Sequence, residues 1–323
     1  VIIFTASIEA IGVLLLCLRF IPLHSVTGGL YYSIFHSISA FCNAGFSLFS
    51  NSLMDYKGDY LVNFVITGLI IMGGIGFVVL HELRAGIFSR VARISLHSKL
   101  VLMVTGILLF GGMVVFMLLE WNNTLAGLPI QSKLLASWFQ SVTARTAGFN
   151  TLDYGMMTGA TLFFTILLMF IGASPGSTGG GIKTSTIGVF IALAISRYRG
   201  REDVSLFNRA IPKDVVFKAF SVGLISGLLI VTFVIFILAV ELGATPHQES
   251  RGIFLNLLFE AMSAFGTVGL STGITPILSY PTKLLLILLM FAGRLGPLTI
   301  AIAFTKKEAR GRFRHPEENV IIG

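Results

Sequence analysis

The sequence predicts an all-α integral membrane protein built from repeated units, and three observations lead to this fold class. Of its 323 residues, 54% are hydrophobic and only 12% are charged, whereas a soluble globular protein carries about 25% charged residues. The basic residues are clustered, with 15 of the 23 Lys and Arg in three short segments. Three stretches, 39–47, 142–150 and 263–271, also align on a shared glycine, which indicates that the unit carrying them is repeated.

The clustered positive charge favours a membrane protein over a nucleic-acid-binding protein. The basic segments are 84–99, 197–218 and 306–314, and they alternate with apolar segments as cytoplasmic loops do in membrane proteins. The two cysteines, Cys17 and Cys42, cannot form a disulfide framework and lack metal-ligand spacing. We therefore expect a multi-pass protein of the plasma membrane, surrounded by lipid and without a nucleic-acid partner.

The three aligned stretches can bind a cation through their backbone. None contains a carboxylate or a histidine, so they offer backbone carbonyls, and glycine allows the positive φ that points successive carbonyls one way. Rings of such carbonyls replace the water shell of K⁺ in potassium filters, and Thr267-Val268-Gly269 matches the TVG part of that filter. We expect K⁺ here, with Na⁺ as the second candidate ion and no organic cofactor. The predicted ion-binding residues of these filter loops are Cys42, Asn43, Ala44, Gly45, Thr146, Ala147, Gly148, Gly266, Thr267, Val268 and Gly269.

The apolar segments predict six crossings and three re-entrant half-helices. A crossing helix needs about 20 residues, so the shorter segment before each filter loop enters the membrane without crossing it. These half-helices are 27–41, 131–144 and 251–265. The crossings are 1–20, 60–81, 100–120, 155–196, 214–240 and 282–304. Glycines at 73, 74 and 76 in the second crossing predict close packing against another backbone.

Each unit is then a span, a half-helix, a filter loop and a second span, arranged around a central pore. The predicted units are 1–82, 83–197 and 198–304, followed by a cytoplasmic tail at 305–323. Six crossings return the chain to its starting side, so both termini are expected in the cytoplasm with the basic loops.

The crossing at 155–196 contains an interruption, 172–184, with five glycines and a proline. Lipid cannot satisfy irregular backbone, so this segment must be shielded by protein or line a watery cavity. A phosphate-binding loop is a poor match, because Ile182 separates Gly181 from Lys183 and no strand precedes it. We predict a gate below the filter, with Lys183 facing either the cavity or the inner interface. The gate residues are Gly172, Ser174, Pro175, Gly176, Ser177, Thr178, Gly179, Gly180, Gly181, Lys183 and Arg294.

Three charged residues at membrane depth lead to separate expectations. Arg294 follows Gly269 at a spacing similar to that of the interruption after Gly148, so a buried Arg294 is expected to reach the interruption and pair with its oxygens. Arg145, at the base of the second filter loop, is expected to face outward and orient that loop. Glu9 lies inside the first crossing and is either functional or bound to a neighbouring helix.

Four groups of residues resemble the Trk/Ktr/HKT superfamily of cation transporters, and the resemblance covers essentially the whole chain. They are Asn43-Ala44-Gly45-Phe46, Thr146-Ala147-Gly148-Phe149-Asn150, the interruption, and Gly293-Arg294-Leu295-Gly296-Pro297. The resemblance implies a K⁺-translocating subunit with four such units around one pore and the interruption as an intramembrane gate. The tail residues 314–319 look most like the membrane-spanning subunit of the bacterial Ktr branch.

The resemblance also implies a homodimer that rests on a cytosolic nucleotide-binding ring of RCK type. Three units are visible where the family has four, so a further unit of about 100 residues, with its own filter glycine, is expected upstream. The three visible glycines, Gly45, Gly148 and Gly269, favour K⁺.

Two other functions compete with potassium conduction. A secondary transporter would couple Na⁺ or H⁺ to K⁺ uptake and use Glu9 or Glu120 in a relay. The nearly uncharged filter loops favour conduction. A membrane-embedded enzyme is disfavoured because the chain has no His-Glu-x-x-His motif and no acidic pair.

Overall fold

The computed structural model describes residues 2–88, 94–201, 203–243, 245–246, 248–250 and 252–296. The expected tail, the end of the crossing at 282–304 and Pro297 lie outside these residues. Within them the regular structure is helical apart from one short hairpin, in which β1 (Ser205–Leu206) pairs antiparallel with β2 (Arg209–Ala210). The predicted all-α fold is confirmed.

The same order of elements occurs three times in the described residues. After the sequence prediction, we name its parts in chain order the first span, the pore helix (the predicted half-helix), the filter loop, a 3-10 turn and the second span. The first spans are α1 (Ile2–Leu23), α5 (Leu96–Glu120) and α9 (Lys213–Leu242), and the pore helices are α2 (Val26–Phe41), α6 (Ile130–Thr143) and α10 (Ile253–Gly266). The turns are η1 (Met54–Tyr56), η2 (Tyr154–Met156) and η3 (Thr275–Ile277). The second spans are α3 (Tyr60–Ile75) with α4 (Phe77–Phe88), α7 (Gly159–Phe170) with α8 (Thr184–Tyr198), and α11 (Tyr280–Leu295).

Three helices, α1, α5 and α9, are each long and apolar enough to cross a membrane, and the bent pair α3–α4 makes a fourth candidate span. Their outward faces carry large exposed apolar side chains such as Leu14, Phe110 and Leu228. Exposed apolar surface on this scale marks contact with lipid or with another protein. Of the remaining second spans, one is divided by the interruption into α7 and α8, and the other, α11, ends at Leu295 with Gly296 as its C-cap.

The crossing expected at 60–81 is a bent pair of helices, because the chain turns by 103° between α3 and α4. The bend lies at Gly76, whose φ of 96° and ψ of 140° are not helical. The Phe77 N–H donates to the Gly176 carbonyl at 3.1 Å, so the interruption bonds the chain where the α3 helix ends. At Gly73, an added methyl group would collide with the Phe41 carbonyl, which confirms the close packing expected from the glycines.

Each first span is tied to the start of its second span. Asp59, Thr158 and Ser279 are the N-caps of α3, α7 and α11, and each accepts from the N–H three residues on. In the first unit Arg19 forms an ion pair with the Asp59 cap. In the other two units, carboxylates at the ends of α5 and α9 accept from the cap N–H at 2.9 Å, Glu120 from Thr158 and Glu241 from Ser279.

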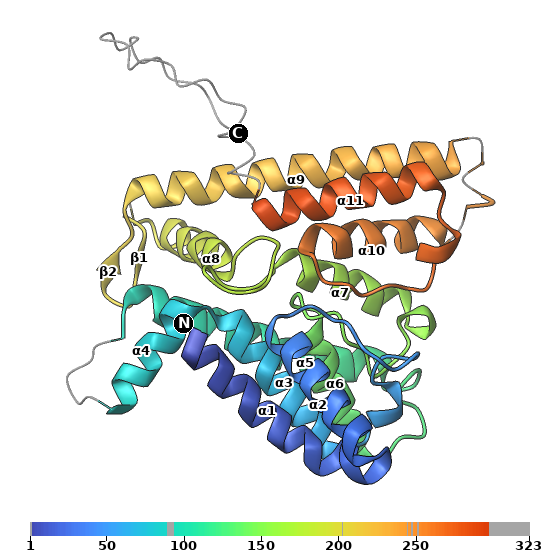
Figure 1. Ribbon diagram of the computed structural model, residues 1–323. Helices are drawn as coiled ribbons and strands as arrows, with labels where there is room; N and C mark the ends of the chain where they lie inside the picture. The colour runs from blue at the N-terminus through green and yellow to red at the C-terminus, as the bar shows by residue number, and fades with distance from the viewer. Residues whose placement is uncertain are drawn as a thin grey trace, which may run out of the picture.

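The described parts of the basic segments 84–99 and 197–218 lie at one end of the molecule. In Figure 1, the start of α1, the end of α4 and the hairpin β1–β2 are at the same end. Arg197, Arg199 and Arg209 at that end are exposed. The filter loops follow the other ends of the first spans, after the pore helices turn back into the molecule.

Candidate functional site

The three filter loops share one backbone conformation. Asn43, Thr146 and Thr267 have φ of 51°, 71° and 49°, in the left-handed region that non-glycine residues rarely adopt. Two residues later, Gly45, Gly148 and Gly269 have φ of 73°, 80° and 92°. The pattern of two positive φ angles separated by one residue therefore occurs in all three loops. Their common conformation was expected for the glycines only.

The loops meet one another in space. A methyl group added at Gly45 would lie 2.7 Å from the Ala147 carbonyl oxygen and 2.8 Å from the Gly148 Cα. One added at Gly148 would collide with the Val268 carbonyl oxygen, and one at Gly269 would lie 3.6 Å from the Gly148 Cα. The first loop therefore adjoins the second, and the second adjoins the third. No side chain larger than glycine fits where the first two glycines approach.

Most oxygens of these loops are unpaired. Among the described residues, no donor reaches the carbonyl oxygens that surround the three glycines, which are those of Ala44, Gly45, Ala147, Gly148, Val268 and Gly269. The side chains at the left-handed positions also carry buried oxygens without a partner, namely Asn43 Oδ1, Thr146 Oγ1 and Thr267 Oγ1. Buried polar atoms are nearly always satisfied, so one such oxygen from each of three converging loops indicates a site for a cation or for water.

The N–H groups of the loops, in contrast, are bonded to the pore helices. The Ala44, Ala147 and Val268 N–H groups donate to the carbonyls of Ser39, Thr143 and Ser263 at 2.9, 3.1 and 2.8 Å.

The hydroxyls of the same three pore-helix residues also hold the loops. Ser39 and Thr143 donate to the carbonyls of Phe46 and Phe149, and Ser263 accepts from the Gly269 N–H. These hydroxyl residues were missed in the sequence because the second loop is one residue shorter than the others, so alignment on the glycines places Val142 opposite Ser39.

The interruption folds back on itself between α7 and α8. The Gly172 N–H donates to the Ile182 carbonyl at 2.9 Å, and the Ala173 N–H donates to the Gly180 carbonyl at 3.4 Å. Ser174 Oγ and Thr184 Oγ1 lie 3.0 Å apart, and Ser177 Oγ donates to the Ser174 carbonyl. Gly176 and Gly181 have φ of 68° and 69°. Pro175 faces Gly76, where an added methyl group would lie 2.6 Å from its carbonyl oxygen.

Three consecutive residues of the interruption contact the three filter loops. Thr178 Oγ1 accepts from Asn43 Nδ2 at 3.0 Å. A methyl group added at Gly179 would collide with Thr146 Oγ1, and one at Gly180 would collide with Thr267 Oγ1. The contacts are with the left-handed residue of each loop in turn. The predicted gate residues 178–180 therefore lie directly against the filter residues.

Two basic side chains bind carbonyls of the same segment. Lys183 Nζ donates to the Gly179 carbonyl at 2.6 Å, and Arg294 Nη1 donates to the Thr178 carbonyl at 2.5 Å. Lys183 therefore turns back onto the interruption instead of reaching the inner interface. Arg294 makes the contact expected from the sequence from the last turn of α11, but it is exposed and not buried.

The interruption is also bonded to the end of α3. The Ser174 and Thr178 N–H groups donate to the carbonyls of Gly74 and Gly73 at 3.0 and 3.3 Å. Thr178 Oγ1 lies 3.1 Å from the Gly73 carbonyl and 3.3 Å from the Phe41 carbonyl. Protein groups from the first unit thus satisfy irregular backbone that lipid could not.

The expected outward orientation of Arg145 is wrong. Its side chain is 7% exposed and faces a small cavity lined by residues of α3, α5 and the interruption, among them Gly74, Thr105 and Ala173. The half-helix ends inside the molecule, so a side chain at the base of the loop is surrounded by protein. The Arg145 Nε has no partner among the described residues.

Two further candidate residues, Cys42 and Glu9, lie in different surroundings. The Cys42 side chain is exposed at the end of α2, whereas Gly266, at the corresponding position, is the buried last residue of α10. The Glu9 carboxylate has no hydrogen bond among the described residues, although its carbonyl accepts from Ser37 Oγ at 2.8 Å. The hydrogen bond considered for the Glu9 side chain is therefore not found.

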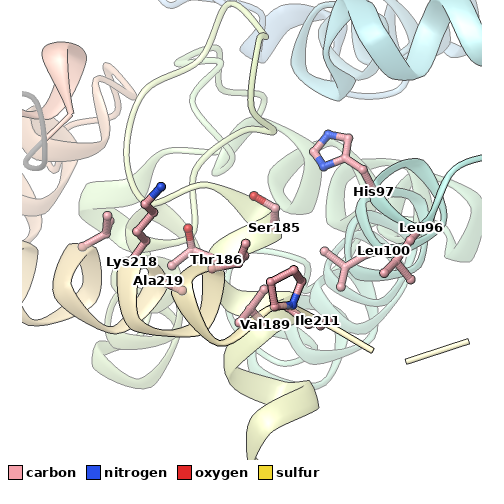
Figure 2. Close-up of a pocket in the computed structure, with 12 residues that line it drawn as sticks. Leu96, His97, Leu100, Ser185, Thr186, Val189, Ile211, Lys218 and Ala219 are labelled. Atoms are coloured by element: carbon pink, nitrogen blue, oxygen red, sulfur yellow. The ribbon is translucent and has the colours of Figure 1, made fainter. Parts of the chain in front are cut away.

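One apolar cavity of the molecule is separate from these loops. Figure 2 shows it among α5, α8 and α9, with His97 and Lys218 on opposite sides and Ser185 and Thr186 between them. Its volume is about 470 Å³. Its lining is mainly aliphatic and none of the filter residues faces it, so it does not offer a shell of oxygen ligands to a cation.

Comparison with known proteins finds similarity to proteins of cation and potassium transport. Residues 1–315 match the family model described as TrkH, cation transport protein. The chain is 45% identical over 324 residues to the Ktr system potassium uptake protein B of Bacillus subtilis, covering 99% of this chain and 70% of that protein. It is 38% identical to the protein of the same name from Vibrio alginolyticus, covering 99% of this chain and 69% of that one.

Two further similarities extend the comparison. The potassium/sodium uptake protein NtpJ of Enterococcus hirae is 38% identical, over 99% of this chain and 70% of its own length. The crystal structure of the potassium transporter TrkH from Vibrio parahaemolyticus superposes with a TM-score of 0.73 at 18% identity, covering 93% of this chain and 62% of that one. The chain thus spans about seven tenths of the curated relatives it matches.

Proposed function

The chain belongs to the TrkH family of cation transport proteins, and we propose that it carries K⁺ across the plasma membrane through the three filter loops. The interruption between α7 and α8 acts as the gate. Relatives at 38–45% identity are named as potassium uptake proteins, and one name includes sodium, so Na⁺ is the second candidate ion.

The unpaired oxygens of the filter loops carry this proposal. Each loop presents carbonyls without a donor and one buried side-chain oxygen without a partner, and no carboxylate lies in any of the three loops. Neutral oxygens without excess negative charge suit a monovalent cation, because they replace its water shell without trapping it. A divalent cation would instead be expected to require carboxylates.

The position of the interruption supports its role as a gate. Residues 178–180 touch all three filter loops, and two of their carbonyls are occupied by Lys183 and Arg294. Fixed positive charge beside the path raises the energy of a passing cation in a medium of low dielectric constant. Movement of this segment away from the loops would remove the obstruction and carry the Lys183 charge with it.

We further propose a partner at the cytoplasmic end. Two of the relatives are named as proteins of a Ktr system, and this chain is proposed to work as a homodimer on an RCK-type nucleotide-binding ring. The exposed arginines near the hairpin, Arg197, Arg199 and Arg209, offer basic groups at the end of the molecule where such a ring would bind. A two-component flux assay with ring protein and nucleotide tests this part separately.

The experiment that tests transport is a reversal-potential measurement on the full-length protein in liposomes. Potassium conduction predicts a reversal potential that follows the K⁺ gradient and is unaffected by a pH gradient. A potential that depends on the Na⁺ or H⁺ gradient would instead indicate coupling.

Glu120, which a coupled transporter would use in a relay, already accepts hydrogen bonds from protein groups. The Glu120 carboxylate accepts from Thr158, Thr161, Asn123 and Thr124 at the end of α5. A carboxylate whose oxygens already accept this many hydrogen bonds is fixed in place and is poorly suited to a relay. Failure to detect K⁺ flux above that of protein-free liposomes would contradict the proposal.

A further inference from the structure

We propose that three buried side chains, His36, Gln140 and Glu260, are positioning residues that hold the filter loops from behind and so determine ion selectivity. This inference rests on the proposed function of the loops. It assigns a task to residues that do not themselves touch the ion.

The three residues occupy the same position in their pore helices. Each lies one turn before the hydroxyl residue that bonds its loop, three residues ahead of Ser39, Thr143 and Ser263. Each is buried, with 0%, 0% and 6% of the side chain of His36, Gln140 and Glu260 exposed. Residues three apart lie on the same face of a helix, so each pore helix presents two polar groups to its own loop.

Glu260 makes the most extensive set of contacts. Its carboxylate accepts from Ser271 Oγ at 2.5 Å, from Thr275 Oγ1 at 2.7 Å and from the Thr272 N–H at 3.3 Å. These partners begin two residues after Gly269 and extend to η3. One charged group therefore fixes the whole segment by which the third loop leaves the filter, through charge-assisted hydrogen bonds.

Gln140 does the same in the second unit with an amide. Oriented by its neighbours, its oxygen accepts from the Leu152 and Thr151 N–H groups at 2.8 and 3.3 Å, and its nitrogen donates to Tyr154 Oη at 2.7 Å. These partners begin three residues after Gly148 and extend to η2.

His36 provides a weaker contact in the first unit. Its Nδ1 donates to the Tyr32 carbonyl at 2.8 Å, so Nε2 accepts from Ser47 Oγ at 3.1 Å. The ring stacks on Phe49 at a centroid distance of 4.8 Å. Ser47 lies two residues after Gly45, the position that Ser271 occupies after Gly269. The segment that follows each filter glycine is thus braced by an imidazole, an amide or a carboxylate.

This arrangement assigns selectivity to the group behind each loop. Carbonyls that face a K⁺ ion must keep their spacing when a smaller Na⁺ ion would draw them together. The N–H groups of the loops are held by the pore helices on one side of each glycine, and the three braces hold the chain on the other side. Removal of a brace lets the loop contract, which lowers discrimination before it lowers flux.

The test compares two buried carboxylates with similar hydrogen bonding. Glu260→Ala and Glu260→Gln are measured in full-length protein in liposomes, with Glu120→Ala and Glu120→Gln as matched controls. Glu120 is also buried and also accepts hydrogen bonds from hydroxyl and N–H groups, but where the end of α5 contacts the start of α7. The readout is the K⁺/Na⁺ permeability ratio from bi-ionic reversal potentials, with thermal stability measured on the same samples.

We expect Glu260→Ala to lower the permeability ratio about tenfold, the equivalent of one hydrogen bond to a charged group. Glu260→Gln, which keeps an acceptor oxygen, restores part of the ratio. The Glu120 variants lower thermal stability and leave the ratio unchanged.

If Glu260→Ala fails to fold, Ser271→Ala, which removes one partner of the same carboxylate, gives the same comparison with a smaller fall. Equal ratios in the Glu260, Ser271 and Glu120 variants would overturn the inference. The proposed function would still stand if Gly148→Ser altered the ratio in that same assay, and would fail with the inference if it did not.

Discussion

The filter loops and the interruption are both glycine-rich segments without regular structure, and they meet face to face, yet their carbonyls have opposite surroundings. In the filter loops, the carbonyls around Gly45, Gly148 and Gly269 have no donor among the described residues. In the interruption, the carbonyls of Thr178 and Gly179 are occupied by Arg294 and Lys183. The filter loops therefore leave these carbonyls without a donor, whereas the interruption has two carbonyls that accept hydrogen bonds from cationic side chains.

This difference separates two uses of the same backbone chemistry. A carbonyl with a tethered cation is satisfied permanently, so the interruption needs no ion to be stable in its present position. Carbonyls without a donor are satisfied only by water or by a mobile cation. The comparison therefore predicts that glycine substitutions in the filter change which ion passes, whereas changes at the interruption alter how readily any ion passes.

Gly148→Ser gives the largest expected effect and tests the filter side of the comparison. The added side chain would occupy a left-handed backbone position and collide with the Val268 carbonyl. Left-handed strain and overpacking together amount to about 2–4 kcal/mol, so K⁺/Na⁺ discrimination should fall about a hundredfold. Permeability ratios in liposomes measure this fall.

Gly127→Ser is the matched control for Gly148→Ser. Gly127, in the turn between α5 and α6, has a similar φ of 74° but no atom within 4 Å of an added methyl group, so backbone strain is present without the collision. Discrimination should be close to that of the parent protein. An equal loss in both variants would attribute the effect to backbone strain and not to the contact between loops.

Deletion of Ser177–Gly181 is the second test and addresses the interruption. The deletion removes the residues that touch all three filter loops. It also removes both carbonyls that accept hydrogen bonds from Lys183 and Arg294. Basal K⁺ flux should rise more than tenfold, because more than one hydrogen bond to a charged group is lost. Discrimination between K⁺ and Na⁺ should stay at the parent value. A folded deletion variant with unchanged flux would show that the gate lies elsewhere.

Much of this fold could be read from local sequence patterns. The alternation of spans and short half-helices follows from segment length and hydropathy, and the three filter glycines follow from their alignment. The meeting of Arg294 with the interruption follows from similar spacing within two copies of one unit. Each of these inferences uses information contained in a single unit.

Two features that the sequence does not predict arise from contact between units, and a third arises from loop length. The 103° bend between α3 and α4 lies where the second unit's interruption bonds the first unit's chain, and no property of 60–81 alone indicates a partner. The outward orientation expected for Arg145 follows from its loop alone, whereas residues of α3, α5 and the interruption surround the side chain. Ser39, Thr143 and Ser263 were missed because a one-residue difference in loop length hides their equivalence.

Arg294→Ala is the third test and concerns one contact of the interruption. The change removes the hydrogen bond to the Thr178 carbonyl, which is worth about 1.5–3 kcal/mol for a charged donor. Basal K⁺ flux should rise about tenfold, less than in the deletion because the contacts of Lys183 and Thr178 remain. Arg294→Lys keeps a charged donor, so its basal K⁺ flux should lie between that of Arg294→Ala and that of the parent. Flux at the parent level in Arg294→Ala would remove this arginine from the gate.

Thr178→Val gives the smallest expected effect and measures the neutral contacts of the interruption. The Thr178 hydroxyl accepts from Asn43 Nδ2 at 3.0 Å and lies within 3.3 Å of the carbonyls of Gly73 and Phe41. Valine keeps the shape of threonine but loses these bonds, whose net value is about 0.5–1.5 kcal/mol. The backbone bond from Arg294 to the Thr178 carbonyl does not depend on this side chain.

Basal K⁺ flux through Thr178→Val should therefore rise about threefold, with the permeability ratio unchanged. Thr178→Ser is the control, because it keeps the hydroxyl and removes only the methyl group, so its flux should match the parent. Equal increases in the two variants would assign the effect to lost packing. A change in the permeability ratio in Thr178→Val alone would show that the Asn43 contact shapes the filter as well as holding the gate, and the division of roles between the two segments would then not hold at this residue.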